Sequence, residues 1–477
     1  MDETRKRRDA FLASLPPEWP EDLLPAIQER ARKSARKVVV LDDDPTGTQT
    51  VHGVPVLTEW PVELLVEALR SDYPAFYLLT NSRSLPEDKA RALNIAIASN
   101  LTQAREISGC DFTIISRSDS TLRGHFPAEL QALEDTLGSF DAWLVIPFFP
   151  EGGRFTLDDF HYVAEGEWLT PVGQTEFARD ASFGYHSSNL REWVSEKSAT
   201  FRGGRVEGRI PASQVASIAL EDLRQDGPQQ VARRLLALPH GGVCVVNAFS
   251  YRDLEVLVLA LLDAEAQGRR YLYRTAASFV RVRAGIEPQA LLTSADLDLP
   301  SGPGGLVVAG SYVPKTTVQI DWLVRETNIH AVEVSAENLL EERTREEEIA
   351  RVLREVNGLI AAGRDTLVYT SRALITAASA EGSLAIGRAI SEGLTAIVRR
   401  LAARPRYLLA KGGITSSDIA TRGLGIRRAL VAGQVLPGVP VWQAGPESRF
   451  PELTYIVFPG NVGEPDALAR VVRALEG

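Results

Sequence analysis

Short runs of apolar, mostly β-branched or aromatic residues recur along the chain, and most of them end in a polar cluster. In the first half these runs occupy residues 38–41, 75–79, 112–115, 143–146 and 243–246. Apolar runs of this length, bounded by polar residues, are typical of strands buried inside a sheet. Helical patterns separate them, for example over residues 63–70 and 87–101. The alternation predicts an α/β fold with a mostly parallel sheet that helices cover on both faces.

A second block of the same kind follows a stretch without clear periodicity. Strands are predicted over residues 306–309, 366–370, 407–410 and 453–458, and helices over residues 341–363 and 382–403. We therefore predict two α/β domains with mostly parallel sheets and an active-site cleft between the domains. The expected division is an N-terminal helical arm (1–37), a first domain (38–285), a linker (286–305) and a second domain (306–477).

Composition narrows the classes of protein. The 477 residues include 62 acidic and 52 basic side chains, a net charge of −10, which argues against binding to nucleic acid or to an anionic membrane surface. Cys110 and Cys244 are the only cysteines, too few for a disulfide framework or a four-thiolate metal site. The first residues lack the apolar stretch of a signal peptide. We expect a cytoplasmic protein, and a homodimer in which the arm packs on the second copy is left open.

Three adjacent acids, Asp42, Asp43 and Asp44, follow the first predicted strand and precede Pro-Thr-Gly. In parallel sheets ligands bind beyond the carboxyl ends of the strands, and neighbouring carboxylates need a cation or hydrogen-bond donors. A bound Mg²⁺, or a substrate hydroxyl that needs a base, would account for the cluster. A plain turn, for which Asp-Pro-Thr-Gly is well suited, is the alternative.

Arginines and hydroxyls follow the next two predicted strands. Arg83 lies in Thr-Asn-Ser-Arg-Ser after the second strand, and Arg117 and Arg123 flank Asp119 after the third. Arginine forks suit carboxylates and hydroxyl-rich anions. An N-capped helix with a local ion pair is the alternative.

Other sequence patterns give weaker evidence of function. Residues 147–163 include two glycines with Arg154 and His161, but a structured loop over the sheet edge explains them nearly as well. His-x-x-His, Cys-x-x-Cys and Gly-x-Ser-x-Gly are absent, and no predicted strand is followed by Gly-x-Gly-x-x-Gly. A serine hydrolase and a dehydrogenase on an α/β scaffold therefore lack support.

Glycine turns follow three predicted strands of the second domain. They contain Gly310, Ser311 and Lys315; Lys411, Gly412, Gly413, Ile414 and Thr415; and Gly460 and Gly463. Backbone amides at such turns can bind phosphate, although the first turn lacks the second glycine and, at the required spacing, the Lys-Ser/Thr pair of a Walker A loop. Only seven lysines occur in the chain, and two of them lie in these turns. A compact ammonium near phosphates would explain that placement, and chance is the alternative.

Together these motifs resemble the four-carbon acid sugar kinases, ATP-dependent enzymes that act on threonate, erythronate or 3-oxo-tetronate. The resemblance rests on DDDPTGTQTVHG, SRSDSTLRGHFPAE, GSYVPKTTVQI, AKGGITSSDIATRGLG and PGVPVW followed by VFPGNVGEPDAL, which occur in this order from about residue 38 to the C-terminus. It implies an N-terminal acid-sugar-binding domain and a C-terminal nucleotide-binding domain.

The resemblance also implies roles for matching positions. The family's Asp-Asp-x-Thr-Gly falls on Asp43, Asp44, Thr46 and Gly47, and its Asp-Ser-Thr-Leu-Arg-Gly on residues 119–124. The implied nucleotide positions are Gly310, Ser311, Gly412, Gly413, Ile414, Thr415, Gly460 and Gly463. The last loop departs from the family because Phe458 and Pro459 replace Lys-Ser and Val462 replaces Phe. Lys411 is the expected substitute for the missing charge.

We therefore expect a kinase that uses ATP and Mg²⁺ to phosphorylate a hydroxyl of a small sugar acid. Asp44, or its neighbour Asp43, is the expected base, and the metal ligands stay unassigned. The residues expected around the sugar acid are Asp42, Thr46, Arg83, Arg117, Asp119 and Arg123, with the arginines at its carboxylate. Lys315 and Lys411 are expected beside the glycine turns at ATP. A non-catalytic sugar-acid or nucleotide sensor is the alternative, which the missing lysine favours.

Overall fold

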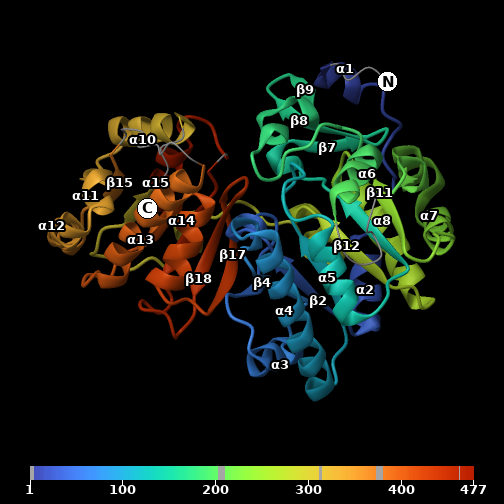
Figure 1. The fold of residues 1–477 in the computed structure, drawn as a ribbon, viewed down its shortest axis with the longest axis horizontal. Helices are drawn as coiled ribbons and strands as arrows, with labels where there is room; N and C mark the ends of the chain where they lie inside the picture. The colour runs from blue at the N-terminus through green and yellow to red at the C-terminus, as the bar shows by residue number, and fades with distance from the viewer. Residues whose placement is uncertain (1–4, 202–209, 311–313, 372–379, 461, 477) are drawn as a thin grey trace. The chain divides into compact units, whose positions relative to one another are not determined.

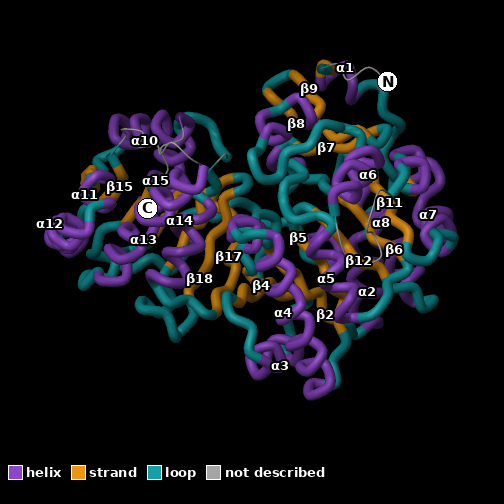
Figure 2. Tube along the Cα trace, in the orientation of Figure 1, coloured by secondary structure: helices purple, strands orange, loops and turns teal. Residues whose placement is uncertain are grey.

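The computed structural model describes residues 5–201, 210–310, 314–371, 380–460 and 462–476. The chain divides into two compact units (Figure 1). The first unit is Met1–Val51 with Glu59–Pro288, and the second is His52–Thr58 with Gln289–Gly477. Both are α/β, as the sequence predicts, and the strands of each run among its helices (Figure 2).

The first unit is built on a parallel sheet of seven strands. Their order is β10 (Ala216–Ile218), β11 (Gly242–Val246), β6 (Ala142–Ile146), β12 (Tyr271–Thr275), β5 (Phe112–Arg117), β2 (Lys37–Asp42) and β4 (Ala75–Leu79). The central strands are buried almost throughout, which explains why they appear in the sequence as continuous apolar runs.

Two groups of helices pack around this sheet. One group consists of α3 (Val62–Arg70), α4 (Glu87–Ser108) and α5 (Ala128–Leu137). The other consists of α2 (Leu24–Ser34), α7 (Gly227–Leu236), α8 (Tyr251–Ala266) and α9 (Ala277–Arg283). Two further helices of this unit are α1 (Arg8–Leu12) and α6 (Leu190–Thr200). Among the described residues of the helical arm expected over residues 1–37, only those of α1 and α2 are helical.

A small antiparallel sheet stands where a structured loop was the alternative interpretation of residues 147–163. Its order is β1 (Lys6–Arg7), β9 (Trp168–Pro171), β8 (Phe160–Glu165) and β7 (Arg154–Leu157). Asp158 and Asp159 connect β7 to β8 with φ angles of 51° and 66°, the left-handed pair of a tight hairpin turn. Because this turn contains no glycine, the sequence lacks the usual hairpin signal.

The second unit has a mixed sheet of eight strands. Their order is β3 (Val54–Leu57), β17 (Arg428–Leu436), β18 (Val439–Ala444), β19 (Thr454–Phe458), β16 (Leu408–Lys411), β13 (Leu306–Ala309), β15 (Thr366–Thr370) and β14 (His330–Val334). The last five are parallel, whereas β3, β17 and β18 run antiparallel to their neighbours. The helices are α10 (Pro314–Glu326), α11 (Ala336–Leu340), α12 (Glu342–Ala361), α13 (Ala380–Arg400), α14 (Gly413–Asp418) and α15 (Ala467–Glu476).

Residues 289–305, which lie in the expected linker, belong to the second unit. Leu292 and Leu297 are buried in its core beside β13 and α15. The Leu292 amide also donates to the Gln434 carbonyl at 2.7 Å. Across the described ranges, no helix combines the length and the apolar character that crossing a bilayer requires.

Candidate functional site

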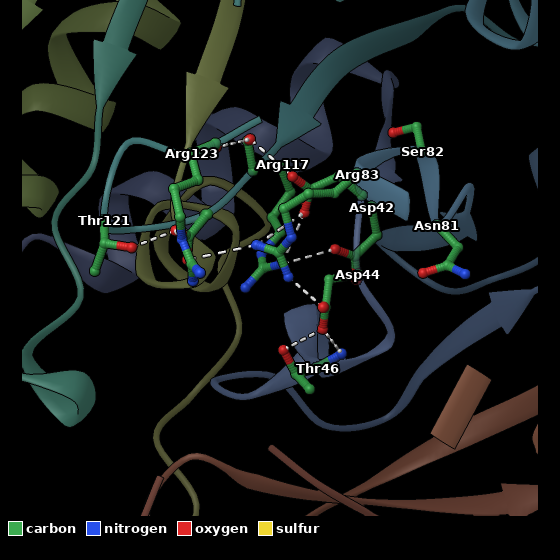
Figure 3. Close-up of polar contacts among 12 residues, drawn as sticks. Asp42, Asp44, Thr46, Asn81, Ser82, Arg83, Arg117, Thr121 and Arg123 are labelled. Carbon is green, nitrogen blue, oxygen red and sulfur yellow. Dashed lines mark hydrogen bonds and ion pairs between the residues drawn. The ribbon is translucent and has the colours of Figure 1, made fainter. Parts of the chain in front are cut away.

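The polar clusters that follow β2, β4 and β5 meet at one edge of the first unit's sheet (Figure 3). In the sheet register Asp42 pairs with Leu79 of β4 on one side and with Arg117 of β5 on the other. Since these strands are parallel and neighbouring, their carboxyl ends lie together. The structure therefore brings together all eight sequence-predicted side chains of this unit: Asp42, Asp43, Asp44, Thr46, Arg83, Arg117, Asp119 and Arg123.

Arg117 lies between the first two acids. Its Nη1 is 3.0 Å from Asp42 Oδ1 and 3.4 Å from Asp43 Oδ1, and all three side chains are buried. The Ser118 hydroxyl donates to the other Asp43 oxygen at 2.9 Å. Burial raises the pKa of Asp42 to about 7, against the opposing effect of Arg117. Burial therefore makes Asp42 easier to protonate than an ordinary aspartate.

Asp44 is held in its ionised form. Its Oδ1 accepts from the Thr46 amide at 2.9 Å and from the Thr46 hydroxyl at 2.5 Å, while Arg83 donates to Oδ2. Burial by itself would raise the pKa of Asp44, but Arg83 and Thr46 outweigh it and the pKa lies below its ordinary value. Asp44 also caps the short turn that follows, so this segment forms the turn considered from the sequence and belongs to the charged cluster as well. A Cβ on Gly47 would lie 2.1 Å from the Asp42 carboxylate, which explains the glycine.

Arg83 and Asp119 link the two sides of the cluster. Arg83 Nη1 is 3.5 Å from Asp119 Oδ1 and 3.9 Å from Asp43 Oδ1. Arg123 Nε donates to Asp119 Oδ2 at 2.7 Å, so the local ion pair considered from the sequence exists, in a loop ahead of α5. Burial opposes ionisation of Asp119, but Arg123 and Arg83 outweigh it and the pKa of Asp119 lies well below its ordinary value.

Two neighbouring groups were not singled out from the sequence. Arg274, from the unpredicted strand β12, donates to the Arg123 carbonyl at 3.0 Å. Glu129 of α5 accepts from the Ser82 hydroxyl at 2.5 Å, and burial followed by the charge of Asp43 raises the pKa of Glu129 to about 7. The only signal for β12 in the sequence was the short run Tyr-Leu-Tyr-Arg-Thr, which has an arginine near its end.

The glycine turns of the second unit also meet at one sheet edge. The register pairs Lys411 with Ala309 of β13 and with Phe458 of β19, so Gly310, Gly412 and Pro459 follow three neighbouring parallel strands. Gly412 has φ +110° and its amide donates to the Phe458 carbonyl at 2.8 Å. Ser311 lies outside the described residues.

Lys411 is the only buried lysine in the described part of this unit, and its exposed fraction is 0%. Its Nζ donates to the Pro459 carbonyl at 3.1 Å and lies 4.3 Å from the centre of the Phe458 ring. Burial, with a smaller contribution from the charge of Lys315, lowers the pKa of Lys411 to about 7. Lys315 itself is exposed at the start of α10.

The remaining predicted positions line the same turns. Gly413 and Thr415 lie in α14, and Ile414 between them is 57% exposed. Among the described residues, and apart from its chain neighbours, the nearest atom that a Cβ on Gly460 would meet is the Gly412 Cα at 4.0 Å. Gly463 has φ +85°, and the turn around it is held by the Gln319 amide, which donates to the Gly463 carbonyl at 3.3 Å.

The described residues contain no group of three or more His, Cys, Asp or Glu side chains arranged to hold a metal ion. The oxygen donors of Asp43 and Asp44 have the chemistry that Mg²⁺ prefers, but arginines already neutralise both carboxylates. Mg²⁺ at nucleotide sites needs only one or two carboxylates, because substrate phosphates provide further ligands. The donor set therefore fits a metal that is bound chiefly by phosphate.

The fold is that of a two-unit α/β protein with polar or glycine-rich residues at the strand ends of each unit. Residues 38–283 match the model of a sugar-binding N-terminal domain, and residues 306–468 match that of a nucleotide-binding C-terminal domain. The chain belongs to the family that joins these domains, the four-carbon acid sugar kinase family, which confirms the resemblance seen in the sequence motifs.

Named relatives agree with this membership, and solved structures share the fold. The chain is 28% identical over 409 residues to a 3-oxo-tetronate kinase of Methylobacterium radiotolerans, covering 83% of this chain and 88% of that one. It is 26% identical over 383 residues to a D-erythronate kinase of Heliobacterium modesticaldum, covering 76% and 79%. A crystal structure from Salmonella typhimurium LT2 matches with a TM-score of 0.65 at 17% identity, covering 91% and 98%. Haemophilus influenzae protein HI1011 matches with a TM-score of 0.61 at 19% identity, covering 92% and 100%. These two structures show similarity of fold alone.

Proposed function

We propose that this protein is an ATP-dependent kinase that phosphorylates a hydroxyl of a four-carbon sugar acid such as threonate, erythronate or 3-oxo-tetronate. The main support is the Asp–Arg cluster at the strand ends of the sugar-binding domain. The relatives named as 3-oxo-tetronate and D-erythronate kinases support the same reaction. Phosphoryl transfer needs a proton acceptor, positioned reactants and neutralised phosphate charge, and the two sets of residues supply these groups.

Asp44 is the proposed proton acceptor, and Asp43 is the alternative. The Asp44 side chain is 13% exposed, whereas those of Asp42 and Asp43 are 2% and 3% exposed, so a substrate hydroxyl reaches Asp44 more easily. Arg83 and Thr46 fix the orientation of this carboxylate and keep it ionised. The oxygen of the substrate hydroxyl would attack the γ-phosphorus of ATP while the hydroxyl proton passes to Asp44, and ADP would leave.

The glycine turns of the second unit are the proposed ATP site. Backbone amides near Gly310, Gly412 and Gly413 would contact the phosphates, and Gly460 lies beside Gly412. Lys411, with Lys315, would supply the positive charge that Phe458 and Pro459 do not provide. Mg²⁺ is the proposed accompanying ion and would neutralise phosphate charge when bound.

The test is release of ADP in the presence of a panel of four-carbon sugar acids. We expect turnover with at least one acid, none without acid, and loss of turnover in Asp44→Asn. A sensor would behave differently: it would bind acid or ATP in calorimetry and release no ADP. Binding without turnover across the whole panel would contradict the kinase assignment.

A further inference from the structure

The arginines of the Asp–Arg cluster are already paired with the protein's own acids. Arg83 contacts Asp44 and Asp119, while Arg117 contacts Asp42 and Asp43. Arg123 contacts Asp119 at 2.7 Å. A substrate carboxylate is bound most strongly by a cation whose charge is not yet neutralised.

Two arginines beside the cluster are not neutralised in this way. Among the described residues, no carboxylate lies within ion-pair distance of Arg154 or Arg274. Arg274 is 2% exposed, and its Nη1 has no hydrogen-bond partner. Arg154 is partly exposed, and its buried Nε likewise has no partner. A cation withdrawn from water without an ion-pair partner is costly for a folded protein, and an anionic ligand would offset that cost.

The small antiparallel sheet turns Arg154 toward the cluster. Arg154 and Thr156 lie two residues apart on β7 and so share a face of the sheet. The Thr156 hydroxyl bonds to His161 Nδ1 at 2.8 Å, and His161 Nε2 bonds to the Ser120 carbonyl at 2.7 Å. This face of β7 is therefore fixed against the loop that carries Asp119 and Arg123.

Phe177 places Arg154 close to Arg123. The Cζ atoms of Arg123 and Arg154 lie 5.1 Å and 5.4 Å from the centre of the same Phe177 ring. The Tyr185 hydroxyl donates to the Thr121 carbonyl at 2.7 Å, which anchors the loop on another side. Arg154 thus lies at the rim of the cluster, partly exposed, with Asp119 near its charge but no carboxylate of the described residues within 4.0 Å.

We propose that Arg154 binds the carboxylate of the sugar acid and thereby selects acids over neutral four-carbon polyols. Arg274, which donates to the Arg123 carbonyl, adds a second positive charge that has no carboxylate of the described residues within 4.0 Å. Arg83, Arg117 and Arg123 then serve chiefly to hold the aspartates and to donate to substrate hydroxyls. This proposal rests on the proposed function, because it assumes that a sugar acid is the substrate.

The test compares Arg154→Gln and Arg154→Lys with the wild type. KM is measured for the active sugar acid, for ATP, and for threitol or erythritol, which lack the carboxylate. Loss of a charge-assisted bond should raise KM for the acid by about 10- to 150-fold. KM for ATP and any activity on the polyol should stay unchanged, and Arg154→Lys should recover part of the loss. Arg36→Gln is the matched control, because Arg36 pairs with Asp111 at the opposite, amino end of β2.

The outcomes separate this inference from the proposed function. A wild type that phosphorylates no sugar acid would reject both. An active wild type with an unchanged KM for the acid in folded Arg154→Gln would reject the inference alone, as would an equal loss for acid and polyol. Melting curves establish folding. If Arg154→Gln does not fold, Arg154→Lys decides, since it must still raise KM for the acid and leave KM for ATP unchanged.

Discussion

The two sheet edges that carry the candidate sites solve the problem of buried charge in different ways. In the first unit Asp42, Asp43 and Arg117 are buried together and neutralise one another. In the second unit Lys411 is buried with backbone carbonyls as its hydrogen-bond partners. Burial moves the pKa of Asp42 up and that of Lys411 down, both to about 7 and so toward the neutral form. The charges of the first edge are thus already neutralised by one another, and we call it the pre-neutralised edge. At the second edge, Lys411 becomes charged most easily when an anion binds beside it.

The largest expected effect comes from removing the proton acceptor of the pre-neutralised edge. Asp44→Asn should lower turnover by roughly 10²–10⁴-fold, with sugar acid and ATP still bound. The asparagine carbonyl can still accept from the Thr46 amide, so the turn should persist. Turnover is measured by ADP release, and binding by calorimetry. Near-normal turnover here together with an inactive Asp43→Asn would exchange the two roles.

Adding a side chain at Gly460 of the second edge should have the next largest effect. In Gly460→Val the nearest atom to the new Cβ, among the described residues and apart from its chain neighbours, is the Gly412 Cα at 4.0 Å. Folding should therefore be preserved while the side chain occupies the proposed phosphate site, and ATP affinity should fall by about 10- to 100-fold, the equivalent of about 1.4–2.8 kcal/mol. Calorimetry with ATP measures this loss.

Gly358→Val is the control for this variant. A Cβ on Gly358 of α12 would likewise have no atom of another described segment within 4 Å. It should bind ATP as the wild type does. Equal ATP affinity in folded Gly460→Val would remove this turn from the nucleotide site, while sugar-acid binding should be unaffected in either variant.

A smaller effect concerns the pH dependence of the first edge. The pKa of Glu129 is raised from 4.5 to about 7, so this side chain is mostly protonated at pH 6 and mostly charged at pH 8. A sugar acid is ionised throughout this range, and the added negative charge should weaken its binding by roughly 10-fold. Affinity for the acid should therefore fall as pH rises. Glu129→Gln, which can still accept from Ser82, should flatten this profile, leaving the contribution of Asp42. An unchanged profile would separate Glu129 from the site.

The smallest expected effect is the number of protons that the second edge takes up when ATP binds. Because the pKa of Lys411 is about 7, below its ordinary 10.5, most of these side chains are neutral at pH 8. Phosphate near Nζ favours the charged form, so ATP binding should take up to about one proton. Calorimetry in buffers of different ionisation enthalpy measures this uptake. Lys411→Met should abolish it, and an uptake that persists in this variant would assign the proton to another group.

The sequence predicts much of the fold because buried parallel strands are continuous apolar runs. The runs that became β2, β4, β5 and β6 were placed to within a residue or two. The hairpin of β7 and β8 was missed because its turn uses two aspartates in place of glycine. β17 and β18 were missed because their ladder pairs residues across a turn and contains irregular register, which local periodicity does not reveal.

The location of the candidate site could be predicted from the sequence better than the pairing of its acids with its arginines. Parallel strands bring their carboxyl ends together, so the meeting of Asp42 with Arg117 follows from the strand pattern. Which acid neutralises which arginine depends on side-chain packing between distant segments. The contacts of Arg83 with Asp44 and Asp119 are of this kind. The orientation of Arg154 depends in the same way on the His161 contact with the Ser120 carbonyl.

The most direct test of the account is ³¹P nuclear magnetic resonance of the wild-type protein with ATP, Mg²⁺ and the panel of four-carbon sugar acids. The account predicts that the γ-phosphate signal of ATP is replaced by the signals of ADP and of a new phosphomonoester, in equal amounts and only when an acid is present. Conversion of ATP to ADP and inorganic phosphate, or no conversion with any acid of the panel, would contradict it.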